Sequence, residues 1–198
     1  RVPMKNIHSS IMISELSYNR NERGITIHIP QHIIETEQWE TRDMSDDLST
    51  DELLALGLSA AQLGELDLAQ RVADRLAGLA AENPNNTNLN LVSMEVNALT
   101  MYQRGEKQNA VSMLLKAVEM AENQSPPRGA ASPLKPVHEL AGDVLLDMGE
   151  HKRAAELYEA SLRRMANRPR ALLGAGRSYA GLGDSYNARQ RYQDFYAL

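Results

Sequence analysis

The chain has 198 residues, of which 42% are hydrophobic, enough to form one globular domain or one short helical solenoid. The net charge of −5 argues against a general affinity for nucleic acid, and the absence of cysteine excludes disulfides, thiolate metal sites and cysteine nucleophiles. No apolar run approaches the roughly 20 residues of a membrane-spanning helix, so no membrane span is predicted. The chain opens with Arg1-Val2-Pro3, without a start methionine or a signal-peptide layout. We therefore expect a fragment of a longer chain, and the compartment stays open.

Residues 1–48 show the weakest pattern. Isoleucines at positions 25, 27 and 29 alternate with polar residues, which alone would suggest a short strand. Pro30 disfavours a strand interior but is tolerated in the first turn of a helix, and the run after it favours a helix ending near Glu37. We interpret this region as a degenerate helical repeat, and the stretch 41–49 as its eroded end or a linker.

Two helix pairs are predicted between residues 49 and 123. Ser49 and Glu52 form a capping box before an apolar helix that Gly64 ends, and an amphipathic helix returns from residue 66 to residue 82. The second pair, 89–104 and 106–122, is hinged at Gly105. A loop rich in proline follows at 123–132.

The stretch 133–192 contains one pattern twice, at a spacing of 34 residues. The recurring positions are Gly142 and Gly176, Leu145 and Tyr179, Gly149 and Gly183, Ala154 and Ala188, and Tyr158 and Tyr192. A fixed period of this length is typical of a stacked helix-turn-helix repeat. The chain from residue 49 is therefore predicted to form four helix pairs, at about 49–83, 88–123, 133–166 and 168–198.

Small residues are expected where the two helices of each pair cross. They are Gly57, Ala98, Gly142 and Gly176 on the first helices, and Ala69, Ala110, Ala154 and Ala188 on the second. One pair cannot bury its apolar stripe alone, whereas stacked pairs can. The predicted fold class is therefore all-α, an α-α superhelix.

The repeated series from Ala141-Gly142 to Tyr158 and from Ala175-Gly176 to Tyr192 resembles the tetratricopeptide repeat (TPR). The usual tryptophan of that repeat is replaced by His138 and Leu172, and its closing proline is displaced to Pro169. The string 133–140, with the elements at 161–162, 167–168 and 171–175, resembles the C-terminal repeat region of large bacterial TPR proteins. That resemblance implies an interaction scaffold without catalytic residues or a cofactor. It also places the turn of an earlier repeat at 36–39.

The sequence gives little evidence for a metal site or a phosphate-binding loop. His28 and His32 are spaced as a helical metal pair, but Pro30 lies between them and no HExxH motif forms. Gly174 and Gly176 lie within a predicted helix and follow no strand, so they do not form a phosphate loop. We expect no metal site and no catalytic residue.

The first helix of each pair is expected to line the concave face, where a partner would bind. Glu139, Asp143 and Asp147 are spaced four apart and are predicted to share one helical face. Arg170 and Arg177 occupy the same side of the next pair, and Leu99 and Tyr102 that of the preceding pair. One interpretation is a solvated face with an ion pair from Asp143 or Asp147 to Arg177. The other is a groove that selects a basic or mixed-charge peptide, with Leu99 and Tyr102 as its apolar anchor.

Three function classes remain open from the sequence. The first is a scaffold that binds a peptide or helix of a partner protein on the concave face. The second is a structural arm of a larger enzyme or receptor, whose groove is filled by its own N-terminal part. The third, a metal-dependent enzyme, predicts stoichiometric metal in the purified protein. In addition, Tyr192, Phe195 and Tyr196 either pack back on the preceding pair or offer an edge for self-association.

Overall fold

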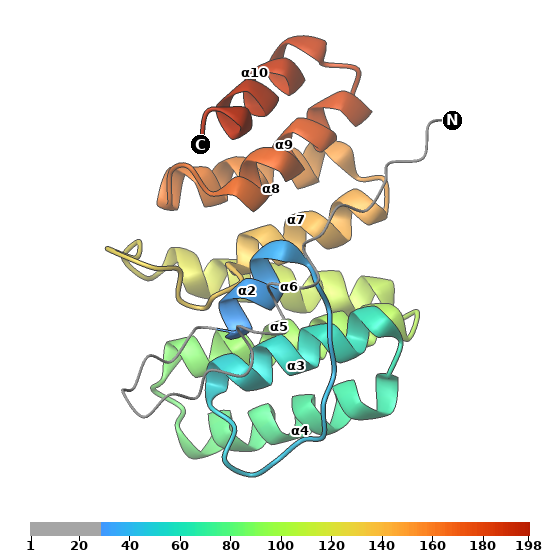
Figure 1. The fold of residues 1–198 in the computed structure, drawn as a ribbon, viewed down its shortest axis with the longest axis vertical. Coiled ribbons are helices and arrows are strands. Elements are labelled where there is room, and N and C mark those ends of the chain that lie inside the picture. Colours follow the sequence, from blue (N-terminus) through green and yellow to red (C-terminus); the bar gives the residue numbers. More distant parts are fainter. Residues whose placement is uncertain (1–28) are drawn as a thin grey trace, which may run out of the picture.

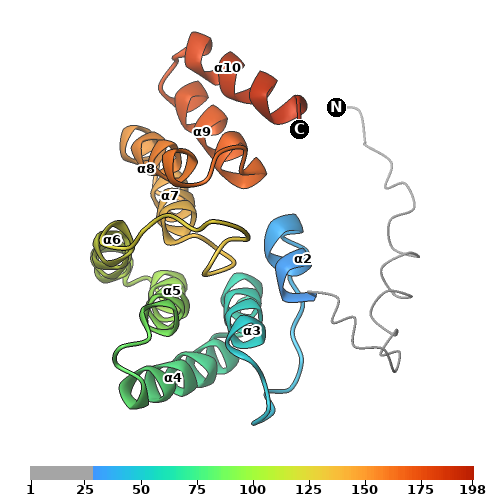
Figure 2. The ribbon, with the colours of Figure 1, turned by 90° about the vertical axis from the view of Figure 1, so that its left-hand side faces the viewer.

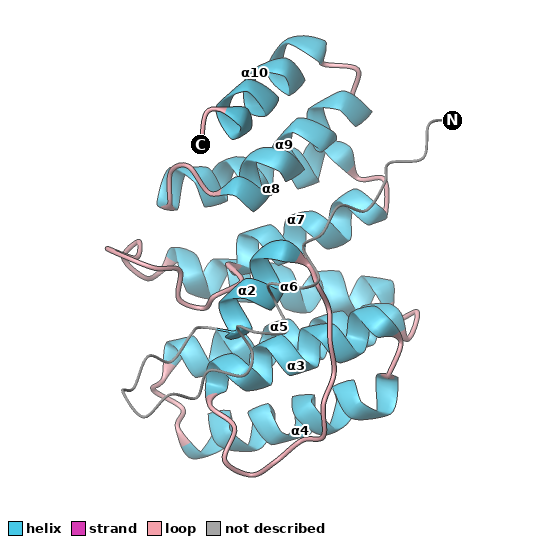
Figure 3. Cartoon of the chain, in the orientation of Figure 1, coloured by secondary structure: helices cyan, strands magenta, loops and turns pink. Residues whose placement is uncertain are grey.

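The computed structural model describes residues 29–198, which form an α-α superhelix (Figures 1 and 3). The predicted strand pattern at residues 25–27 and His28 lie outside this range. Within it the chain forms nine helices and no strand. They are α2 (Ile29–Thr36), α3 (Thr50–Leu63), α4 (Leu66–Glu82), α5 (Thr87–Gln103), α6 (Lys107–Glu122), α7 (Val137–Asp147), α8 (His151–Arg164), α9 (Pro169–Gly181) and α10 (Ser185–Tyr196). None of these helices has both the length and the apolarity that crossing a membrane requires.

The start of α3 shows how local sequence signals set the helix boundaries. The Ser49 hydroxyl accepts a hydrogen bond from the Glu52 backbone amide, and the Glu52 carboxylate accepts one from the Ser49 amide at 2.9 Å. This reciprocal pair satisfies two amides that the first turn leaves without helical partners. The predicted capping box is therefore confirmed.

The turns inside the four helix pairs share one geometry. Each has a glycine in the left-handed region, with φ between 75° and 89°, and the next residue donates a backbone hydrogen bond to the carbonyl five positions earlier. The glycines are Gly64, Gly105, Gly149 and Gly183. This is the Schellman ending of a helix, which a residue with a Cβ atom adopts only with strain. The hinge predicted at Gly105 is thus confirmed.

Close helix packing depends on glycine at the predicted crossings. A Cβ atom on Gly142 would lie 2.9 Å from the Tyr158 ring, and one on Gly176 would lie 2.6 Å from the Tyr192 ring. Gly174 of α9 faces the other side of the Tyr158 ring closely as well. The Tyr158 ring is therefore enclosed between the backbones of α7 and α9, where only hydrogen fits.

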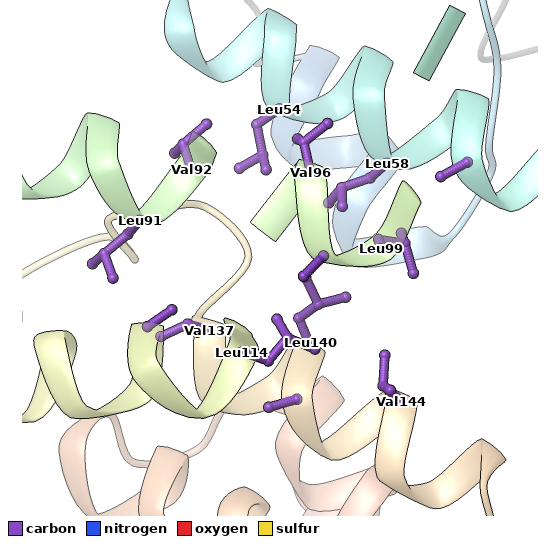
Figure 4. Close-up of a cluster of buried hydrophobic side chains, with 14 of the residues drawn as sticks. Leu54, Leu58, Leu91, Val92, Val96, Leu99, Leu114, Val137, Leu140 and Val144 are labelled. Carbon is purple, nitrogen blue, oxygen red and sulfur yellow. The ribbon is translucent and has the colours of Figure 1, made fainter. Parts of the chain in front are cut away.

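The core runs along the first helices of successive pairs. Figure 4 shows side chains of α3, α5 and α7 meeting in one cluster, with Leu58, Leu99 and Val144 among those labelled. All belong to a continuous set of buried apolar residues that extends through the array. The first helices form the inner side of the superhelix, and the second helices form its outer side (Figure 2). This order sets which side chains can face the concave surface.

Helix α2 stands alone. Residues 37–49 after it form no helix, so the turn that the family resemblance places at 36–39 does not connect two described helices. The interpretation of 41–49 as a linker agrees with this course. Ile33 and Ile34 are buried, and α2 packs on α3 at the inner side of the array (Figure 2). An unpaired helix therefore occupies the concave side.

Candidate binding site on the inner face

A buried pair of charges lies at the centre of the inner face. Glu139 of α7 is 0% exposed and accepts two hydrogen bonds from Arg168, at 2.8 Å from Nε and 2.9 Å from Nη2. The Ser161 hydroxyl donates a third, longer bond of 3.3 Å. Two parallel bonds from one guanidinium fix the carboxylate in angle as well as distance. Glu139 is therefore fully engaged inside the protein.

Arg168 joins three parts of the chain. It precedes the first turn of α9, bonds Glu139 of α7 and also donates from Nη1 to Glu35 of α2 at 2.6 Å. Burial alone would lower the pKa of Arg168, but the hydrogen bonds and charges of Glu139 and Glu35 raise it. The guanidinium is thus a permanent cation shared by two carboxylates.

A second group of charges surrounds Asp143. The ammonium of Lys135 donates to one carboxylate oxygen at 2.5 Å, and the Tyr158 hydroxyl donates to the other at 2.6 Å. Lys135 is only 2% exposed; burial opposes its charge, yet Asp143 and Glu139 leave its pKa above the usual value. Burial, followed by the charge of Asp143, raises the pKa of Tyr158. Asp143 therefore anchors the loop before α7 and the ring between α7 and α9.

Glu95 of α5 is buried near these charges but has no partner for its carboxyl oxygens within residues 29–198. Burial raises its pKa well above the usual value, although the charge of Lys135 opposes this effect and that of Glu139 adds to it. A buried carboxyl without a hydrogen bond favours its neutral form.

The residues predicted to face a partner lie at different depths. Leu99 is 2% exposed within the core, and Tyr102 is buried with its hydroxyl bonded to Asp147. Burial and this bond raise the pKa of Tyr102 to about 12. Leu99, Tyr102 and Glu139 were predicted to contact a partner, but all three are buried and engaged in packing or internal bonds. Asp143 is half-buried, and Asp147 is exposed.

Arg170 and Arg177 both lie on α9. Arg170 pairs with Glu37, just after α2, while its Nε is buried without a partner in the described chain. Burial, followed by the nearby charge of Arg177, lowers the pKa of Arg170. Arg177 is exposed. The ion pair considered from Asp143 or Asp147 to Arg177 does not form within residues 29–198. Asp143 pairs with Lys135 instead, and Asp147 accepts a hydrogen bond from the Tyr102 hydroxyl.

Sequence reasoning missed Lys135, Arg168 and Glu35. It placed Glu95 on the same side of its helix as Leu99 and Tyr102, but gave no sign that this carboxyl is buried without a partner in the described chain. Lys135 lies between Leu134 and Pro136, and this position is the one local signal that it belongs to a constrained loop. Arg168 lies in a turn, where an arginine is usually exposed. Its partner Glu35 is 133 positions away along the chain, so no local pattern could have paired them.

Other features of the described chain suggest no chemistry. No group of three or more acidic or histidine side chains in residues 29–198 is arranged to bind a metal ion. His32 is exposed, and His28, its predicted partner, lies outside the described residues. A pocket of about 190 Å³ beside α5 and α7 is lined partly by His138 and by prolines of the 123–136 loop. His138 bonds Glu122 at 2.6 Å, and burial lowers its pKa.

The fold and its inner face define a TPR-like helical repeat protein. Solved structures of MamA share this architecture: one is 21% identical, covers 75% of this chain and 72% of its own, and has a TM-score of 0.51. Two further MamA structures, designated AMB-1 and MSR-1, are 19% and 20% identical. Each has a TM-score of 0.48; they cover 84% and 78% of this chain and 79% of their own. This likeness concerns the fold alone. No family model and no curated protein sequence matches the chain.

Proposed function

We propose that this protein is a non-catalytic interaction scaffold whose concave face binds a helix or peptide of a partner protein. The observation that carries this proposal is α2, an unpaired helix seated on the inner side of the array (Figure 2). Its contacts combine buried isoleucines with carboxylates that meet arginines of the far pair. An inner face that accommodates one helix in this way has the chemistry to accommodate another.

The binding residues in this proposal are those that remain accessible. Arg177 and Asp147 are exposed, while Asp143 and Arg170 are half-buried at the edge of the charge network. Glu139, Leu99 and Tyr102 support these residues from the interior. Specificity therefore depends on few charges, held in place by a rigid layer beneath them.

A peptide library displayed on phage, selected against the 198-residue chain, tests this function. Peptides selected on the inner face should bind the Arg177→Glu variant at least about tenfold more weakly, because reversing a charge in an interface is repulsive. Arg71→Glu on the outer helix α4 is the matched control and should bind normally, since Arg71 is also exposed. Selection of no peptide, or equal binding by both variants, would overturn the proposed site.

A second candidate function is a structural arm within a larger bacterial TPR protein. The position of α2 on the inner face also favours this function, since a groove that is filled by a segment of the same chain needs no external partner. In this case no peptide displaces α2, and the library experiment yields only binders insensitive to Arg177→Glu. The two candidates therefore predict opposite results.

Self-association through α10 is a further part of the proposal. Tyr192 packs on Gly176, but Tyr196 is 84% exposed and contacts the half-buried Phe195 ring edge-on. Sedimentation across a concentration series should show reversible self-association that Tyr196→Ser weakens. A strictly monomeric wild-type chain at all concentrations would refute this part alone.

A further inference from the structure

Two carboxylates attach α2 to the opposite side of the inner face. Glu35 accepts from Arg168 at 2.6 Å, and Glu37 pairs with Arg170. Apart from these pairs, α2 packs on α3 through Ile33 and Ile34. The helix thus presents aliphatic side chains to one wall and Glu35 to the other, and Glu37 follows just after its end.

The arginines outnumber the carboxylates that α2 supplies. We call Arg168, Arg170 and Arg177 the arginine row. Arg170 and Arg177 are seven positions apart on α9, so their side chains share a helical face. Arg177 has no carboxylate within ion-pair distance among residues 29–198, and Nε of Arg170 is buried without a hydrogen bond. Arg168 pairs with Glu139 and Glu35, and Arg170 pairs with Glu37, so Arg177 carries the one charge of the row that no described carboxylate neutralises.

Release of α2 would leave the array itself supported. Arg168 keeps both of its bonds to Glu139, so the buried carboxylate does not become unpaired. Glu35 and Glu37 are partly exposed, with 23% and 37% of their side-chain surface accessible, and regain water readily. Residues 37–49 form no helix that would have to unfold. Ile34 belongs to the continuous set of buried apolar residues, so release of α2 uncovers apolar surface on α3 that a replacing helix must cover with aliphatic side chains.

We propose that α2 is an exchangeable occupant of the concave face, and that the arginine row binds an acidic, aliphatic helix of a partner protein in its place. This inference rests on the proposed scaffold function and specifies the partner. The partner carries one carboxylate on its helix where α2 has Glu35, a second just beyond the helix end where Glu37 follows α2, and a third that reaches Arg177. It is the opposite in charge to the basic peptide expected from the sequence.

Because α2 occupies the inner face, competition with α2 sets the apparent affinity of a partner helix for that face. A tethered segment acts at an effective concentration on the order of millimolar, so a free helix with only the contacts of α2 competes poorly. A third carboxylate at Arg177 gives the partner an interaction that α2 lacks. Because the pairs are partly exposed, binding should weaken as salt concentration rises.

The test uses the 198-residue chain and two labelled peptides. The acidic peptide has the sequence of residues 29–37, and the neutral peptide has glutamine in place of both glutamates. Glu35→Gln combined with Glu37→Gln weakens the attachment of α2 in cis. If α2 competes, this double variant should bind the acidic peptide about tenfold more tightly than wild type, because its site is free more often. The neutral peptide should bind neither protein measurably.

Two controls keep the test decisive. Adding Arg170→Gln and Arg177→Gln to the double variant should abolish binding of the acidic peptide, whereas adding Arg71→Gln should not. Circular dichroism checks that each variant is folded. The single variant Glu37→Gln weakens the attachment of α2 less than the double variant does. The inference would be overturned if the acidic peptide bound wild type, the double variant and Glu37→Gln with equal affinity. Equal binding of the acidic and neutral peptides would overturn it as well. If library-selected peptides still lose binding on Arg177→Glu, the scaffold function stands and only the acidic partner is wrong.

Discussion

Breaking the buried pair of Glu139 and Arg168 should reveal how much the inner charges stabilise the fold. Glu139→Met leaves a guanidinium, 10% exposed, with Glu35 as its one remaining carboxylate. Arg168→Met leaves a fully buried carboxylate with one long bond, from Ser161. Each single change therefore strands a charge in the interior.

The expected cost follows from this burial. Removing one partner of a buried pair typically costs about 3–5 kcal/mol, while replacing both with apolar groups is often close to neutral. We expect each single variant to lose about 3 kcal/mol or more. The double variant should lose only about 1 kcal/mol, mainly because Glu35 also loses its partner. The coupling energy between the two positions should then exceed about 3 kcal/mol.

Equilibrium unfolding in urea, followed by circular dichroism, measures all four proteins. For a chain of this size each kcal/mol corresponds to about 2–4 °C in melting temperature, which gives an independent check. The matched control is the pair of Arg191 and Glu159, which has equally short bonds of 2.7 and 2.8 Å but is partly exposed. Its single methionine variants should lose less than about 1 kcal/mol. The reasoning would be refuted if the single variants at Glu139 and Arg168 lost as little free energy of unfolding as the control variants. It would also be refuted if the loss in the double variant equalled the sum of the two single losses.

Three further changes test the packing, the buried carboxyl and the helix cap. Gly174→Ala should cost about 3 kcal/mol in urea unfolding because its Cβ collides with the Tyr158 ring, while Gly78→Ala, with open space around it, should stabilise by up to about 1 kcal/mol. Because burial raises the pKa of Glu95 in the folded state, the protonated carboxyl stabilises the fold relative to the ionised one. This contribution to the free energy of unfolding is fully present below the unfolded pKa near 4.5, and it is lost as the pH rises through the folded pKa. Unfolding from pH 4.5 to 8 should therefore show Glu95→Gln gaining stability relative to wild type; a pH-independent difference would contradict this. Ser49→Ala should cost about 1 kcal/mol by thermal unfolding through loss of the capping box, and no change would contradict that role.

The helix pairs could be predicted because their signals are local. The capping box at Ser49 and the left-handed glycines, such as Gly64, depend only on residues a few positions apart. Crossing residues were predictable for a related reason. A repeating glycine opposite a repeating aromatic residue, such as Gly176 opposite Tyr192, indicates a place where backbones approach.

The inner face could not be predicted in the same way. A spacing of four residues turns about 40° beyond a full helical turn each time. Glu139, Asp143 and Asp147 therefore do not share one exposure: the first is buried, the second half-buried and the third exposed. What lies opposite them depends on Arg168, in another turn, and on Lys135, in an irregular loop. The Arg168 contacts are long-range, and the Lys135 contact depends on the path of an irregular loop, so helical periodicity predicts neither.

The long-range charges also change how the array is held together. In a helical repeat array each pair contacts mainly its neighbours, so stability is close to a sum of local terms. Here Arg168 ties α9 to α7 through Glu139 and to α2 through Glu35, across 133 positions of the chain. Helix α2 is itself packed on α3 of the first pair. The first and last described pairs are therefore linked through a single helix on the inner face, and we expect a substitution that loosens this helix to affect both ends of the array.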